Sequence, residues 1–282
     1  MWINNPNIIS DTVKTAVEVT KKQDTGWIMH HVLDARELDF SPFGIVHLPQ
    51  LHLLGMDISI TKHVVFMWLA VVILVVTFLF VAKSYKKSLI PRGVTNLTEV
   101  LIVFVRDEIA RPTIGKGNER FLPYLLTVFF FILTCNFLGL IPYGSTATSN
   151  IAVTATLAII SFVVIQIGGM MKNGVFGYFI GLVPHGIPMW LLPIMIPVEI
   201  LGLFTKPFAL AIRLFANMTA GHIVILALLG LIFILHTYFV VPVSVSFALF
   251  IFLLEILVAL IQAYIFTMLS SLFIGMAVHQ EH

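Results

Sequence analysis

The chain has 282 residues, of which 59% are hydrophobic and 11% are charged, and its mean hydropathy is +1.02. An ordinary soluble domain cannot bury so much apolar surface, so this composition excludes one and predicts a polytopic membrane protein. The net charge of +2 is too small to indicate nucleic-acid binding, for which the sequence also lacks a basic patch interleaved with aromatic residues.

Residues 1–60 form a polar region of mixed charge, which we expect to lie outside the membrane. The region lacks the apolar stretch of a cleavable secretory signal, and residues 11–22 and 31–40 have the pattern of short amphipathic helices. The histidines in and just after it lack the spacing of zinc ligands, so we predict no metal site and no bound cofactor. They are His30, His31, His47, His52 and His63.

The first predicted membrane span covers residues 64–82, which are 19 uncharged residues and therefore long enough to cross about 30 Å of hydrocarbon. Four basic residues follow it: Lys83, Lys86, Lys87 and Arg92. By the positive-inside rule this flank is cytoplasmic, which puts the N-terminus outside. We assign residues 61–282 to a membrane domain.

Residues 96–111 differ from a span because they carry several charges on one side of an amphipathic helical pattern. Asn96 is placed to cap this helix, and Glu99 stands at its third position. We expect a helix that lies on the cytoplasmic interface of the membrane.

Two further spans are predicted at residues 121–141 and 151–171. The loop between them has no positive charge, whereas Lys172 closes the second of the pair, so the chain crosses outwards and returns inwards. Asn136 lies inside the first of these spans, where we favour an interhelical hydrogen bond over a channel role.

The last two spans are predicted at about 198–235 and 238–277, and each is longer than a bilayer requires, so both must tilt or bend. The preceding residues 173–198 are rich in glycine and proline, which predicts a re-entrant or interfacial stretch in place of a long helix. Its relevant prolines are Pro184, Pro188, Pro193 and Pro197. The predicted fold is an all-α membrane protein with about five crossings and a cytoplasmic C-terminus.

Arg213 lies in the middle of an apolar helical pattern, and the next Asp, Glu, Lys or Arg is Glu255. An arginine at the centre of a bilayer costs roughly 2.5–3.5 kcal/mol on insertion scales, so it persists only with partners or in a wet cavity. Its guanidinium stays protonated at physiological pH and cannot itself carry a transported proton. We therefore predict an electrostatic role for Arg213.

The polar residues around Arg213 fall into register across the last two spans. If these spans form an antiparallel hairpin that turns at residues 236–237, two facing pairs result: Arg213 with Gln262, and His222 with Glu255. The pairs lie about 13 Å apart along the helix. Asn217 follows Arg213 by one turn and shares its face. A row of polar side chains inside an apolar helical hairpin suits the passage of protons or ions.

The stretch RLFANMTAGH at residues 213–222, with Glu199 and Lys206 before it and LLEILVALIQAYIF at residues 253–266 after it, resembles the subunit a family of rotary F-type ATP synthases. The resemblance is strong over the last 90 or so residues and looser from about residue 60 onward. Some members carry Glu after the AG dipeptide and His on the last helix. This chain has the exchanged arrangement, His222 and Glu255, which leaves the order of proton transfer between them open.

The resemblance implies a stator subunit that is not itself an enzyme and that packs its last hairpin against a c-ring. Arg213 would face the ring carboxylate and separate two offset half-channels. His222 and Glu255 would belong to the outer half-channel and Glu199 to the cytoplasmic one, while Asn217 and Gln262 would orient water or Arg213. The implied partners are the c-ring, b-type subunits of the peripheral stalk, membrane lipid and protons, in the plasma membrane of a bacterium rather than a mitochondrial or plastid membrane.

Two other classes of protein remain as alternatives. A polytopic secondary transporter is typically built from repeats, but the sequence shows no second copy of the Arg213 helix. A membrane subunit of a redox complex would need axial histidines for haem, and the spans offer only His222 and, near a turn, His236. The sequence leaves open whether protons or sodium ions are carried.

Overall fold

The computed structural model describes residues 34–35, 37–39, 44–49, 52–53, 56–57, 59–87, 92–141, 144–181, 191–235 and 238–279. Within them the long helices are α3 (Lys62–Lys87), α4 (Val94–Phe104), α6 (Leu122–Gly139), α7 (Ile151–Asn173), α9 (Leu192–Leu235) and α10 (Val240–Val278). All of these except α4 are long and apolar enough to cross a membrane. The prediction of an all-α membrane protein is confirmed.

Short elements connect the long helices. The α4 helix continues through a π-helical turn, η1 (Val105–Ala110), into the short α5 (Arg111–Ile114). The 3₁₀ turn η2 (Asn118–Arg120) precedes α6, a second one, η3 (Ala147–Ser149), precedes α7, and α8 (Val175–Ile180) follows α7. The η3 turn packs against α6, α7 and α9.

The region before α3 contains two small antiparallel ladders. Strand β1 (Glu37–Asp39) pairs with β2 (Ile45–His47), and β3 (His52–Leu53) pairs with β4 (Met56–Asp57). The helix expected at residues 31–40 is therefore wrong over β1, because a short amphipathic helix is marginal in water and strand pairing prevails. The helix expected at residues 11–22 lies outside the described residues.

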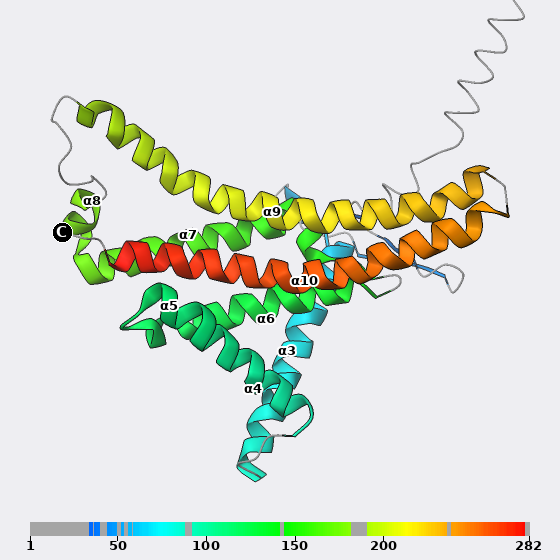
Figure 1. Ribbon diagram of the computed structural model, residues 1–282, viewed down its shortest axis with the longest axis horizontal. Helices are drawn as coiled ribbons and strands as arrows, with labels where there is room; N and C mark the ends of the chain where they lie inside the picture. The colour runs from blue at the N-terminus through cyan, green and yellow to red at the C-terminus, as the bar shows by residue number, and fades with distance from the viewer. Residues whose placement is uncertain are drawn as a thin grey trace, which may run out of the picture.

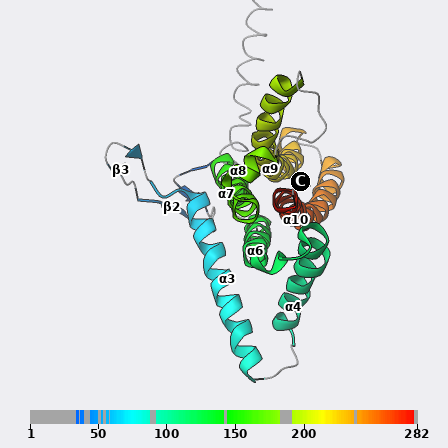
Figure 2. The same cartoon turned by 90° about the vertical axis from the view of Figure 1, so that its left-hand side faces the viewer.

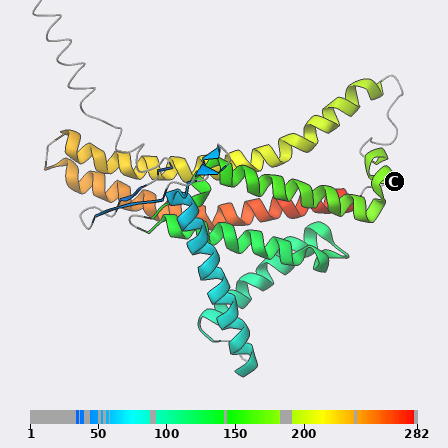
Figure 3. The ribbon, with the colours of Figure 1, turned by 180° about the vertical axis from the view of Figure 1, so that it is seen from behind.

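The helices α9 and α10 form a long antiparallel pair, and α6 and α7 run alongside it (Figure 1). The views from the end and from behind show α3 and α4 standing at an angle to this group (Figure 2, Figure 3). The first part of α9 diverges from α10 before the two helices come together (Figure 1, Figure 3). This divergence leaves the space in which a polar cavity lies.

The start of α9 differs from the sequence-based prediction. The helix begins at Leu192 rather than near residue 198, and it includes Pro193 and Pro197, which we expected to break it. Pro193 stands in the first turn, where its missing N–H would be unpaired in any case. Pro197 removes one further hydrogen bond, but a broken helix in an apolar environment would leave more backbone groups without partners. Pro184 and Pro188 lie outside the described residues.

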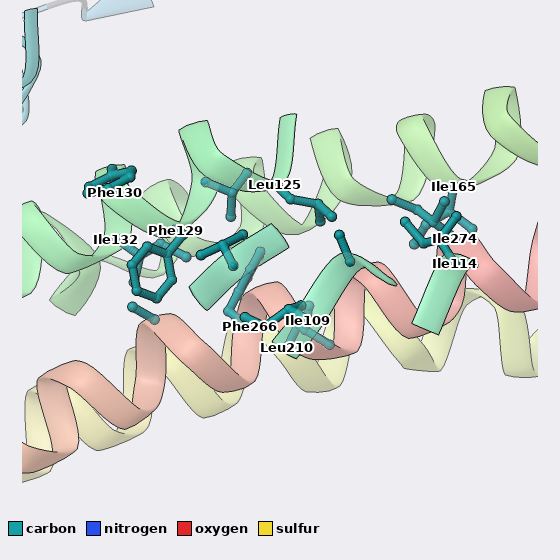
Figure 4. Close-up of a cluster of buried hydrophobic side chains, with 14 of the residues drawn as sticks. Ile109, Ile114, Leu125, Phe129, Phe130, Ile132, Ile165, Leu210, Phe266 and Ile274 are labelled. Carbon is teal, nitrogen blue, oxygen red and sulfur yellow. The ribbon is translucent and has the colours of Figure 1, made fainter. Parts of the chain in front are cut away.

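The largest apolar core lies where the α4–α5 segment packs between α6 and α10 (Figure 4). Ile109 and Leu125 are fully buried there, together with Phe129 and Phe266, which are 2% and 1% exposed. On the segment predicted at residues 96–111, the π-helical turn buries residues near its end, whereas Leu97 near its start is 61% exposed. The end of this segment is thus a packed part of the bundle.

At Gly275, α10 lies close to the backbone of α5. A Cβ atom there would lie 2.1 Å from the carbonyl oxygen of Thr113, and the Thr113 and Ser271 hydroxyls are 2.5 Å apart. We predict that Gly275→Ala lowers the free energy of unfolding by about 1–3 kcal/mol, because the backbone of α5 must move. Thermal unfolding of the detergent-solubilised complex measures this change. Gly202→Ala in α9 is the matched control, since nothing lies within 4 Å of its added methyl group, and an equal loss there would contradict the prediction.

Candidate functional site

Polar side chains meet across the α9–α10 pair at two levels. The Asn217 Nδ2 atom donates a hydrogen bond of 2.8 Å to Gln262 Oε1. One to two turns further along α9, His222 Nδ1 lies 2.5 Å from Glu255 Oε1. Glu255 and Gln262 are only 4% and 2% exposed, so both are buried within an apolar hairpin. The predicted facing of His222 and Glu255 is confirmed.

The surroundings of His222 consist mainly of hydrogen-bond acceptors. Its Nδ1 atom lies 3.0 Å from the carbonyl oxygen of Met218, in addition to Glu255. Its Nε2 atom lies 3.0 Å from the carbonyl oxygen of Gly139 and 3.2 Å from the hydroxyl of Thr146. Carbonyl oxygens accept hydrogen bonds and do not donate them, so the imidazolium form, which donates from both nitrogens, fits this site.

Two glycines leave the space that the side chains around the His222–Glu255 pair occupy. A Cβ atom on Gly221 would lie 2.8 Å from Glu255 Oε1. A Cβ atom on Gly139 would overlap the hydroxyl of Thr146, at 1.5 Å. Small residues at both positions therefore allow the carboxylate, the imidazole and the hydroxyl to come together.

A buried hydrogen-bond network lies beside this pair. The Asn136 amide of α6 donates to the carbonyl oxygen of Ala259 in α10 at 3.3 Å, which confirms the interhelical bond predicted for it. Its Oδ1 atom accepts a bond of 2.6 Å from Thr148. Sequence reasoning missed Thr146 and Thr148, although the hydroxyl-rich loop between the second and third predicted spans was a signal that pointed to them.

Arg213 has a different environment from the one predicted. Gln262 pairs with Asn217, one turn beyond Arg213, and the Arg213 side chain is exposed on α9. Among the residues that the structure describes, its guanidinium has no hydrogen bond or ion pair. It lies on a stripe of exposed small or polar residues with helical spacing: Ala209, Arg213, Ala216, Asn217 and Ala220. We call this the Arg213 stripe.

A cavity of about 370 Å³ lies where the first part of α9 diverges from α10. Its polar lining residues are Gln166, Tyr178, Glu199, Lys206 and His279. Sequence reasoning found Glu199 but left Lys206 out of the site, and the structure places both in this cavity. Burial, assisted by the nearby Glu199 carboxylate, raises the pKa of Tyr178, so its phenol stays neutral.

Arg213 lies between the two polar regions along α9. Glu199 in the cavity precedes it by roughly 21 Å of helix, and His222 follows it by roughly 13 Å. Glu199 and His222 therefore lie on opposite sides of an exposed positive charge. No group of three or more His, Cys, Asp or Glu side chains in the described ranges is arranged to hold a metal ion.

Comparison with known proteins identifies the family. A family model described as ATP synthase A chain matches residues 64–275. The chain is 59% identical over 259 residues to ATP synthase subunit a of Chloroherpeton thalassium, covering 90% of this chain and 77% of that protein. It is 58% identical over 254 residues to ATP synthase subunit a 2 of Chlorobaculum tepidum, covering 89% and 72%. It is 55% identical over 229 residues to ATP synthase subunit a of Myxococcus xanthus, covering 80% and 75%. The chain belongs to the ATP synthase subunit a family.

Proposed function

We propose that this chain carries protons between the two sides of the membrane and a rotating ring of c subunits, without catalysing any reaction itself. The observation that carries the proposal is Arg213, a charged side chain exposed on an apolar helix and without a partner in the described chain. Because such a charge is costly in hydrocarbon, it requires a partner from outside the chain. A carboxylate on the ring would supply that partner, and the small residues of the Arg213 stripe would let a ring helix approach closely.

Two half-channels then lead to the ring from opposite sides. His222 and Glu255, with Asn136 and Thr148 beside them, belong to the outer half-channel. The cavity that contains Glu199 belongs to the cytoplasmic one. Asn217 and Gln262 lie between Arg213 and the outer pair, and their hydrogen bond keeps both amides in place for water or for the guanidinium.

Arg213 couples rotation to transport in this scheme. A fixed positive charge lowers the pKa of a ring carboxylate that passes it and therefore promotes proton release into the cytoplasmic half-channel. The same charge repels a proton that would pass directly between the half-channels. The driving force is about 2.3 kcal/mol per charge per 100 mV, all of which would be lost through such a leak.

The same proposal includes the membrane topology and the remaining partners. Residues 1–60 lie outside, residues 61–282 form the membrane domain, and the C-terminus is cytoplasmic, in the plasma membrane of a bacterium. The basic residues in the last turns of α3 and just after it support this orientation, and the charged residues of the 96–111 segment fit a helix whose polar face lies at the cytoplasmic interface. The b-type subunits of the peripheral stalk are the expected stationary partners.

Glu199→Gln tests the cytoplasmic half-channel. We expect slower proton release to the cytoplasm, because the amide cannot bind and release a proton, with no increase in passive leak, because Arg213 is unchanged. ATP-driven proton pumping in inverted vesicles, together with proton conduction after removal of the catalytic sector, measures both quantities. Glu119→Gln, in the exposed loop before α6, is the matched control. Unchanged pumping by Glu199→Gln across the pH range would remove Glu199 from the channel.

A further inference from the structure

A second histidine–carboxylate pair lies near His222 and Glu255, between the N-terminal region and the starts of α3 and α7. His63, in the first turn of α3, is 1% exposed, and its Nδ1 atom lies 2.7 Å from Asp34 Oδ1. The Asp34 carboxylate is 31% exposed. Its other oxygen accepts a hydrogen bond of 3.0 Å from Asn150, the residue that caps α7. The pair thus connects water to the interior of the protein.

The bonding of His63 resembles that of His222. Its Nε2 atom lies 3.2 Å from the hydroxyl of Ser149, which itself donates a bond of 2.8 Å to the carbonyl oxygen of Thr146. Since the Ser149 proton is engaged, Ser149 accepts from His63, and the Asp34 carboxylate accepts on the other side. Both ring nitrogens of His63 therefore face acceptors, as those of His222 do, and this arrangement suits a histidine that takes up a proton.

The η3 turn joins the two pairs. Its last residue, Ser149, contacts His63, and Thr146, the residue just before it, contacts His222. Thr219 of α9 donates to the carbonyl oxygen of Ser149 at 3.5 Å. A series of polar contacts therefore leads from exposed Asp34, past the η3 turn, to buried Glu255.

We propose that Asp34 and His63 form the outermost proton-accepting pair of this subunit, which collects protons from the outer water and supplies them to His222 and Glu255. The inference rests on the function proposed above. His63 takes up a proton from water and releases a proton inwards, so the pair undergoes no net change in a cycle. Asp34 is a positioning residue, because its contact with Nδ1 orients the imidazole.

The charges around the pair are consistent with this role. Partial burial favours the neutral Asp34 carboxyl, but the hydrogen bond and charge of His63 outweigh it and lower the pKa of Asp34. Asp34 is therefore ionised at every pH at which the complex works. Within the described part of the chain, Lys62 of α3 is the other charged group beside it, and its ammonium interacts with Asp34 electrostatically. The contacts from the side of α7, Ser149 and Asn150, are neutral.

His63→Gln in the intact complex tests the proposal. The amide retains hydrogen-bonding groups but cannot take up a proton. In proteoliposomes, we expect ATP synthesis to fall about tenfold at an outer pH of about 8, and to match the parent complex below about pH 6, where protons are abundant. Asp34→Asn should produce a smaller loss with the same pH dependence. Imidazole added to the outer compartment should restore the activity of His63→Ala.

If the Asp34–His63 pair only holds the N-terminal region against α3 and α7 and transfers no proton, the variants would behave differently. Asn150→Ser removes the hydrogen bond to Asp34 but keeps a side chain that caps α7, so it is the matched control. Any loss of activity by Asn150→Ser should be the same at every pH. If His63→Gln has no effect, or shows such a pH-independent loss, the proposal is wrong. Should His63→Gln fail to assemble, the pH profile of an assembled Asp34→Asn complex decides between the two roles.

The same vesicles separate this inference from the function on which it rests. If Arg213→Ala stops coupled synthesis while His63→Gln shows no pH-dependent loss, only the Asp34–His63 inference fails. If Arg213→Ala retains normal coupling, the proposed function itself fails.

Discussion

Arg213→Ala should reduce ATP synthesis driven by a proton gradient to background while leaving assembly of the complex intact. The Arg213 side chain is exposed and has no hydrogen bond or ion pair with another described residue, so its removal breaks no polar interaction of the described fold. In the proposed function, the variant loses the positive charge that would lower the pKa of a ring carboxylate and block a direct leak. Synthesis by reconstituted complexes, with the amount of subunit a determined in the same preparation, measures both parts of the expectation.

Two further variants make the Arg213 test specific. Arg213→Lys keeps the charge but places it on a flexible stem without the planar donor group, and we expect it to lose most of the activity. Ile212→Ala, at the neighbouring position that is 39% exposed, should retain activity close to that of the parent. Normal coupled synthesis by Arg213→Ala would refute the proposed function.

The His222–Glu255 pair should behave as one unit in transport. The 2.5 Å contact and the burial of Glu255 mean that His222→Ala leaves a carboxyl group in an apolar hairpin without its partner. Breaking a buried pair in this way costs about 3–5 kcal/mol, so each single alanine variant should lose most of its transport. The exchange of His222→Glu with Glu255→His retains both groups, and we expect it to recover a large part of the rate with a shifted pH optimum.

A double-mutant cycle on proton conduction measures the coupling between these two groups. For side chains in contact we expect an interaction energy of about 0.5–3 kcal/mol. A cysteine pair at positions 222 and 255 gives an independent check, because a disulfide requires Cα atoms within about 7 Å. Simple addition of the two single losses, together with no recovery in the exchange, would show that the residues do not act together.

The sequence predicted the fold class and one of the two polar contacts across the hairpin. Long uncharged runs have few alternatives to membrane helices, and the register of an antiparallel pair follows from its turn. The predicted pairing of Arg213 with Gln262 was wrong, because pairing residues by their distance from the turn assumes that the two helices are straight and parallel. Real helices wind around each other, so the partner changes along their length, and Gln262 meets Asn217 instead.

Other parts of the site could not be predicted, because they arise from tertiary contacts that the hydrophobic periodicity of the sequence does not indicate. Ser149 belongs to the short η3 turn and Thr146 directly precedes it, and their positions follow from how that turn packs against α6, α7 and α9. The cavity around Glu199 exists because α9 extends to Leu192 in spite of its prolines and diverges from α10. Asp34 meets His63 across 29 positions of sequence, in a region for which helical patterns were the wrong guide.

The core around Ile109 and Phe266 also has a mechanical consequence. In the proposed function, a ring that turns against the Arg213 stripe would push sideways on α9, and α9 would transmit this force to α10, on which it packs along much of its length. The α10 helix is held in turn by α6, by α7 and by the α4–α5 segment, whose apolar side chains fill the space between them. In this scheme, the stiffness that keeps Arg213 at a fixed height and distance from the ring therefore depends on an apolar core to which α9 itself contributes Leu210 and Leu214.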